Sequence, residues 1–338
     1  MKFKNFIVFS LIISILSAFP VYAADKVEED IMVIEYDDIE DMVLENNINL
    51  EIAKYSIENL EDARDEEREA IRQASELGMT AFTSITNGQI NLLRLNRDQI
   101  EKSQIYTAKS FFIALHQLSN NIKQLELNKA SMEEQLQINK IRYDLGLITE
   151  SVLNSLETSI KETDVTYNTL INSRDSNEIQ FKNILDISSS KEIKLGEIPN
   201  VSIDYIESID LKKDTDLAVK NSISLQIQKQ NQSNSREDSK IRSRQNKLTR
   251  KDIELSMLNQ HNLILEKYDT LENSKKALEN LENEFEVSEF KYLVGLISLN
   301  DFNTAKRQLD LQRLTVEANE ISLFTEAENY EAMKSGMV

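Results

Sequence analysis

One short pattern occurs twice in this chain, and each copy lies between long stretches that contain no proline. Residues 142–149 are Arg-Tyr-Asp-Leu-Gly-Leu-Ile-Thr, and residues 291–298 are Lys-Tyr-Leu-Val-Gly-Leu-Ile-Ser. Glycine permits the left-handed backbone that ends one helix, and a threonine or serine hydroxyl can cap the helix that follows. The pattern therefore predicts two helical hairpins, each of which turns at a glycine.

Apolar residues recur at helical spacing on both sides of each copy. Before each copy, residues recur in steps of four and three, and polar residues fill the positions that apolar ones leave. The apolar members are Leu118, Ile122, Leu125, Met132, Leu136 and Tyr143 in the first half. In the second half they are Leu271, Leu278, Leu281, Phe285 and Tyr292. After the copies, the rhythm runs from Leu153 to Ile184 and from Phe302 to Tyr330. Such seams are typical of antiparallel helices packed as in a coiled coil. We expect an all-α, elongated rod of two internally repeated, long antiparallel helical hairpins, with little or no β-structure.

A second motif also recurs, ahead of each hairpin. Residues 44–50 are Leu-Glu-Asn-Asn-Ile-Asn-Leu, and residues 219–225 are Val-Lys-Asn-Ser-Ile-Ser-Leu. Motifs repeated in the same order indicate an internal duplication. We therefore expect an extended lead-in at 24–36, a first helical repeat at 37–190 with its tip at 143–149, a connector at 191–212, and a second repeat at 213–334 with its tip at 292–298. Within the connector, residues 201–205 alternate weakly, as the residues of the lead-in near residue 33 do.

The least regular segment of the first repeat is residues 77–95. Gly78 and Asn87-Gly88 interrupt it, and an Asn-Gly pair between modestly apolar arms is a signal for a β-hairpin. The arms do not alternate cleanly, so an interrupted helix is the favoured interpretation and a short β-hairpin is the alternative. The corresponding segment of the second repeat, around residues 236–250, is charged and almost without apolar residues.

The amino-terminal residues have the features of a secretory signal. Lys2 and Lys4 precede an apolar run at residues 6–19, and Val21-Tyr22-Ala23 fits the small-residue rule for cleavage. We expect a signal peptide at 1–23 and export from the cytoplasm; an uncleaved membrane anchor is the alternative. The chain has no cysteine, which excludes a lipoprotein signal, disulfides and thiolate-bound metals.

Composition and motifs disfavour nucleic-acid binding and catalysis. The formal net charge of −19 gives no indication of a basic surface that would bind nucleic acid. The two histidines, His116 and His261, show no metal-ligand spacing, and each is expected to be a satisfied or surface residue. The acid pairs Glu133–Glu134 and Asp37–Asp38 suit a helix surface and the cap of the first helix. Phosphate-binding and hydrolase motifs are absent. We therefore predict no enzyme, with no catalytic, metal or cofactor site.

The hairpin tips are the candidate site. Around each turn glycine, large apolar side chains occupy an otherwise polar tip. Exposed apolar residues at the end of a rod mark a contact surface, although packing within the tip would explain them equally well. The candidate residues are Tyr143, Leu145, Gly146, Leu147 and Thr149 in the first tip, and Tyr292, Val294, Gly295, Leu296 and Ser298 in the second.

Taken together, these motifs resemble those of the TolC-like outer-membrane efflux protein family. Residues 294–298 are similar to the Val-Gly-Leu motif at that family's hairpin tips, and the resemblance covers roughly residues 36–330. It implies a homotrimer in the cell envelope, whose hairpins form a tapering helical tunnel for efflux or secretion. It further implies that the tips dock a membrane-fusion adaptor, which couples to an inner-membrane pump.

The resemblance has departures. Typical members carry two membrane-inserting β-hairpins per protomer, and here the second such site has no strand pattern and the first a doubtful one. Ile48 and Ile223 also stand where the family usually has proline. The sequence therefore predicts a reduced relative, and membrane association stays open. The alternative is a secreted coiled-coil scaffold protein of the envelope without a conduit. A helical pore-forming toxin is disfavoured, because it needs a long apolar hairpin.

Overall fold

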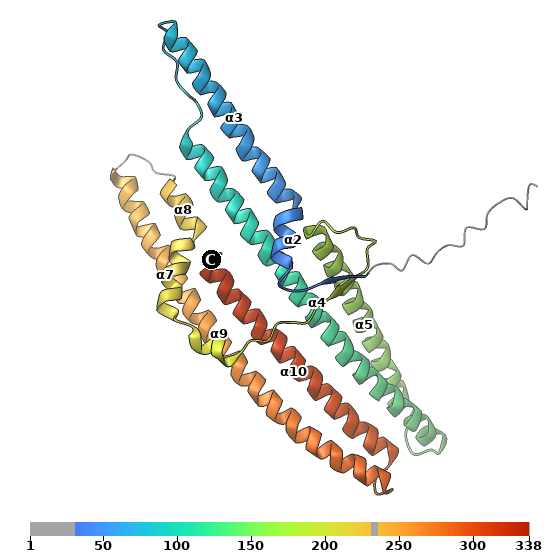
Figure 1. The fold of residues 1–338 in the computed structure, drawn as a ribbon. Helices are drawn as coiled ribbons and strands as arrows, with labels where there is room; N and C mark the ends of the chain where they lie inside the picture. Colours follow the sequence, from blue (N-terminus) through green and yellow to red (C-terminus); the bar gives the residue numbers. More distant parts are fainter. Residues whose placement is uncertain (1–30, 231–235, 338) are drawn as a thin grey trace, which may run out of the picture.

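The computed structural model describes residues 31–230 and 236–337, and helices make up most of that part (Figure 1). The predicted signal peptide at 1–23 lies outside the described residues. The elements are β1 (Met32–Ile34), α2 (Ile39–Asn46), α3 (Ile48–Glu76), α4 (Asn87–Asp144), α5 (Glu150–Ile184), β2 (Ile193–Leu195), α6 (Ile203–Ser208), α7 (Leu211–Asn221), α8 (Ile223–Gln230), α9 (Arg236–Leu293) and α10 (Leu299–Lys334). The prediction of an all-α rod with little β-structure is confirmed.

Two long antiparallel hairpins run along the rod. Helix α4 packs along α5, α9 packs along α10, and α4 also packs against α10, so that the two hairpins lie side by side with both tips at one end (Figure 1). Helices α4 and α9 each have 58 residues. The extra length of the first half lies in α3, which has 29 residues against eight in α8.

The second hairpin is built on the predicted seam. Leu309, Val316, Leu323 and Tyr330, which are spaced by seven residues on α10, are all buried, and the last three pack in one cluster with the buried Leu271, Ile264 and Met257 of α9. Burial of each such side chain stabilises the fold by roughly 1.5–3 kcal/mol. The Tyr330 hydroxyl donates a hydrogen bond to the Asp214 carboxylate of α7 at 3.1 Å. This bond ties the short helices to the rod.

A second cluster holds the first hairpin at mid-height. Tyr36 contacts Phe112 of α4 and Phe324 of α10 edge-on, at centroid distances of 5.5 and 4.8 Å. Phe112 also contacts Phe181 of α5 edge-on at 6.3 Å. The chain just after β1 therefore inserts an aromatic ring among three long helices. We call the level of the rod that contains β1, β2 and the connector the waist.

The waist contains a two-stranded parallel sheet in which β1 pairs with β2. The pairing continues past β2, because the Gly196 N–H donates to the Ile34 carbonyl at 2.8 Å. A Cβ at position 196 would lie 1.9 Å from the carboxylate of the exposed Glu35 side chain, which would have to move aside to admit one. The weak alternation at 201–205 does not produce a strand: α6 begins at Ile203, and the Ser202 hydroxyl caps it by accepting from the Tyr205 N–H.

The helix of the first repeat is interrupted at residues 77–86, as the favoured interpretation predicts. Helix α4 then begins with a capping box in which the Thr86 hydroxyl accepts from the Gln89 N–H. At the start of the first repeat, α2 begins beside Asp38 as expected, but the Asp38 side chain makes no capping hydrogen bond. In the part of the chain that the structure describes, no helix is both long enough and apolar enough to cross a bilayer.

Candidate functional site

The two tips share one backbone conformation. In the first, Gly146 has a φ of +69°, its N–H donates to the Tyr143 carbonyl at 2.8 Å, and the Leu147 N–H donates to the Arg142 carbonyl at 2.8 Å. These two bonds form a Schellman motif, which satisfies the last carbonyls of the helix. The second tip repeats them around Gly295, whose φ is +75°. The backbone explains the need for glycine, since no atom lies within 4 Å of a Cβ built at either position.

The apolar residues beside the two glycines point into solvent. Leu145, Leu147, Val294 and Leu296 are between 51% and 72% exposed. Packing within the tip therefore does not account for these four side chains. Both tips lie at the same end of the rod (Figure 1), so that each tip exposes two of these apolar side chains at that end.

The two tyrosines of the tips have different surroundings. The Tyr292 ring stacks on Phe302 of α10, with the centroids 4.7 Å apart, and Phe285 lies 5.6 Å from the Phe302 ring. Tyr143 is exposed. Of the two tyrosines that the sequence singles out, one is thus part of an aromatic cluster that braces its hairpin and the other lies at the surface.

The hydroxyl residues of the tips also differ. Ser298 occupies the N-cap of α10, and its hydroxyl accepts from the Asp301 N–H while the Asp301 carboxylate accepts from the Ser298 N–H, at 3.1 and 3.2 Å. Thr149 occupies the same position before α5 but makes no side-chain capping bond. The expected capping role is therefore found at Ser298 and is wrong for Thr149.

Polar contacts between α4 and α10 fix the two hairpins relative to each other. The Asn120 side chain donates to the Leu314 carbonyl at 2.9 Å, and Asn120 is buried. Closer to the tips, Arg307 of α10 forms an ion pair with Glu134 of α4. An ion pair that is partly open to water, as this one is, contributes modestly to stability. A buried amide that bonds a specific carbonyl, by contrast, sets the register of two helices.

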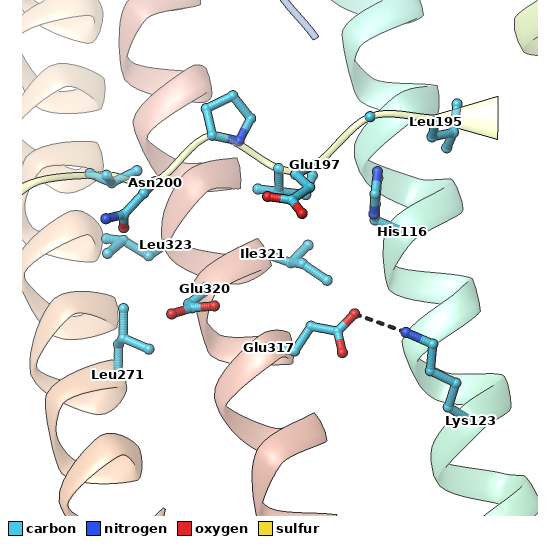
Figure 2. A pocket seen from close by; sticks show the side chains of 14 residues that line it. His116, Lys123, Leu195, Glu197, Asn200, Leu271, Glu317, Glu320, Ile321 and Leu323 are labelled. Atoms are coloured by element: carbon cyan, nitrogen blue, oxygen red, sulfur yellow. Dashed lines mark hydrogen bonds and ion pairs between the residues drawn. The ribbon is translucent and has the colours of Figure 1, made fainter. Parts of the chain in front are cut away.

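A cavity of about 530 Å³ lies at the waist, where residues 195–201 pass over α4 and α10 (Figure 2). Leu271, Ile321 and Leu323 form its apolar side, and a Lys123–Glu317 ion pair of 3.3 Å lies at its edge.

His116 faces this cavity from α4 (Figure 2). Its Nε2 atom is buried and has no hydrogen-bond partner within the described residues, so that one of its two ring nitrogens is unsatisfied. Burial lowers the pKa of His116, against a backbone hydrogen bond at Gly196 that favours the charged form. Across the described residues, no group of histidine and carboxylate side chains is arranged to hold a metal ion.

The architecture matches that of solved bacterial channels. The outer-membrane channel OprN superposes with a TM-score of 0.57 at 9% identity, over 89% of this chain and 90% of that chain. The outer membrane protein VceC of Vibrio cholerae gives 0.52 at 10% identity, over 89% and 96%. The CmeC outer membrane channel of Campylobacter jejuni gives 0.51 at 10% identity, over 89% and 85%.

Sequence comparison alone does not find this likeness. No protein-family model matches the chain, and no curated protein matches it. At 9–10% identity the likeness to the solved structures shows the fold. The resemblance that the repeated turns suggest is therefore confirmed at the level of the fold.

Proposed function

We propose that this chain, which has the fold of the TolC-family outer-membrane channels, is an exported tunnel component of an efflux or secretion system. Three copies assemble into an α-helical conduit in the cell envelope. The hairpin tips dock a membrane-fusion adaptor, which couples the conduit to an inner-membrane pump. Cargo passes through the conduit without bond-making chemistry, so no cofactor is required.

The observation that carries the proposal is the parallel placement of the two hairpins. Contacts between α4 and α10 hold them side by side, with both apolar tips at one end of the rod. A protomer of this kind contributes two hairpins to a ring and presents two tips to a partner below it. The four exposed side chains at residues 145, 147, 294 and 296 are then the contact surface for that partner.

The outer flanks of the protomer support self-association. Exposed apolar residues repeat every seven positions on α9, at Ile241, Leu248 and Leu255. On α5, at the other flank, Val165 and Ile179 are exposed. A row of apolar residues spaced by seven is the pattern by which one helix packs against another. These flanks offer neighbouring copies a helical surface on either side.

Oligomeric mass, measured by light scattering with and without an adaptor protein encoded beside this one, tests the conduit. We expect three copies in the assembly. A strict monomer that never binds an adaptor would contradict the proposal and favour the coiled-coil scaffold instead.

Charge substitutions test the docking surface. The double variant Leu147→Asp/Leu296→Asp should weaken adaptor binding by at least roughly tenfold, since each change places a charge in an apolar contact. The matched control is Ser151→Asp/Asn300→Asp, which adds the same two charges at exposed positions one turn further along α5 and α10. Equal loss of binding in both variants would contradict a specific role of the leucines in docking, and loss of helicity by circular dichroism in the first variant would instead assign them a packing role.

A further inference from the structure

The cavity at the waist has no role in the proposed function, and it is large enough for a small organic molecule. Its volume of about 530 Å³ lies within the usual range of ligand pockets, roughly 300–1,000 Å³. Residues 195–201 of the connector pass over it, and α4 and α10 supply its walls (Figure 2). A molecule held there would contact the connector and both hairpins at once.

The cavity places apolar side chains next to charged ones. Ile321 and Leu323 of α10 and Leu271 of α9 belong to the buried core and form its apolar side. In the view of Figure 2, Ile321 lies between Glu197 and Glu317. A mainly apolar lining with a few polar groups is the usual composition of a site for a small organic ligand. Such a ligand would need both a hydrocarbon part and a polar part.

The charged side chains of the cavity are mostly acidic. Three glutamates, at positions 197, 317 and 320, stand against one lysine, Lys123. Lys123 is already paired with Glu317 at 3.3 Å, and Glu320 pairs at 3.6 Å with Lys275, which lies outside the lining. Glu197 has no ion-pair partner within the described residues. The cavity therefore has an excess of negative charge, which favours a positively charged ligand.

His116 adds a neutral hydrogen-bond acceptor to the cavity. Burial lowers the pKa of His116 more than the hydrogen bond with the Gly196 backbone raises it, so the ring is uncharged at neutral pH. Because the hydrogen bond with Gly196 favours the charged form, the ring donates it, and the ring atom without a partner is Nε2. In a neutral imidazole, the nitrogen that carries no proton is an acceptor. Nε2 is therefore a buried acceptor that lacks a donor.

These groups together select one class of ligand. An anion would be repelled by the excess of glutamates. A neutral apolar molecule would leave both the negative charge and Nε2 without partners. A metal ion is disfavoured, because no group of histidine and carboxylate side chains among the described residues is arranged to hold one. An organic ammonium ion satisfies all three requirements, since it brings positive charge, N–H donors and an apolar substituent.

We propose that the waist cavity is a binding site for a small organic ammonium ion that carries an apolar group. The glutamates attract the ammonium group, Nε2 of His116 accepts one of its N–H groups, and Ile321 and Leu323 contact the apolar group. Residues 197–201, which form neither helix nor strand, move aside to open the way to the buried Nε2. The site lies within one protomer, so the proposal depends neither on assembly of the conduit nor on adaptor docking.

The two histidines of the chain make the test local. His116 lines the cavity and His261 does not, so isotope-labelled histidine in the untagged full chain gives a reporter and an internal control by NMR. Addition of phenethylammonium should shift the ring signals of His116, with a dissociation constant on the order of 1 mM or below. The signals of His261 should stay in place. Phenethyl alcohol, which is neutral, and hydrocinnamate, which is an anion of similar size, should bind at least roughly tenfold more weakly.

A pair of matched variants tests the charge of the cavity. Glu197→Gln/Glu320→Gln removes two charges without changing side-chain size, and should weaken phenethylammonium binding by roughly fivefold or more, with unchanged circular dichroism. Glu192→Gln/Glu286→Gln removes two charges at exposed positions outside the cavity, and should change binding by less than about twofold. The proposal is overturned if phenethylammonium does not shift the His116 signals. It is also overturned if the three aromatic probes bind equally, or if both double variants weaken binding equally.

Discussion

The two hairpin tips have nearly the same sequence and the same turn backbone, yet they differ in how they are braced. In the second tip, Tyr292 stacks on Phe302, and Ser298 and Asp301 form a reciprocal cap. In the first tip, Tyr143 is exposed and Thr149 caps nothing. The shared motif thus specifies a turn, and the flanking residues decide how firmly the turn is held. We expect the second tip to be the rigid one and the first to adapt.

The largest difference in local stability between the two tips should come from the aromatic cluster of Tyr292, Phe302 and Phe285. Phe302→Ala removes the ring that contacts both Tyr292 and Phe285, and should destabilise the second tip by about 2 kcal/mol. Leu153 occupies the corresponding position in the first hairpin, and Leu153→Ala should destabilise the first tip by about half as much. Hydrogen exchange of the amides in the first turns of α10 and α5 measures both. Equal effects would remove the distinction between the tips.

The glycines should behave alike. Gly146→Ala and Gly295→Ala each place a side chain at a φ near +70°, which costs about 1–1.5 kcal/mol. Because both glycines have open space around a Cβ, this cost is conformational and should agree between the two tips to within about 0.5 kcal/mol. Local hydrogen exchange is again the measurement. A much larger effect at one glycine would show that its turn is restrained by neighbours as well.

The caps should behave differently from each other. Ser298→Ala removes a capping box and should cost about 1 kcal/mol in the local stability of α10. Thr149→Ala removes no capping bond and should be close to neutral. Amide exchange at residues 299–302 and 150–153 reports the two effects. Protection lost equally at both helix starts would contradict the structural difference.

The smallest effect should come from building the helix cap of the second tip into the first tip. Val152 is exposed and occupies the position in α5 that Asp301 occupies in α10. Val152→Asp should therefore complete a capping box with Thr149 and stabilise the start of α5 by about 0.5 kcal/mol. The control is Val152→Asn, which keeps the size and lacks the charge. Slower exchange in the Asp variant alone is the expected result.

Much of the difference between the two tips can be predicted from the sequence, because the interactions that determine it are local. The Ser-x-x-Asp of the second tip fits the side-chain geometry of a capping box, and the Thr-x-x-Val of the first does not. The heptad positions predict the buried face of α10 because the period of a helix repeats over many turns. These features lie within a few residues or follow a rule that the chain repeats.

The structure of the waist, by contrast, could not be predicted from the sequence. Strands β1 and β2 have three residues each and pair across a separation of about 160 positions, so neither carries a periodic signal. The close approach of the Glu35 side chain to Gly196 exists only in the fold. The unpartnered Nε2 of His116 likewise depends on the segment 195–201 passing over α4. Long-range contacts of a few residues decide all three.

The position of the waist also determines how far a small rotation there would move the hairpin tips. The connector and β1 cross the long helices near His116, and below that level α4 runs to Asp144 packed against α5 and tied to α10 by Asn120 and Glu134. At about 1.5 Å per residue this lower arm is roughly 40 Å long, so a rotation of roughly 5° at the waist would sweep the tip sideways by about 4 Å. A small change of angle at the waist would therefore be magnified at the hairpin tips, where the exposed apolar side chains lie.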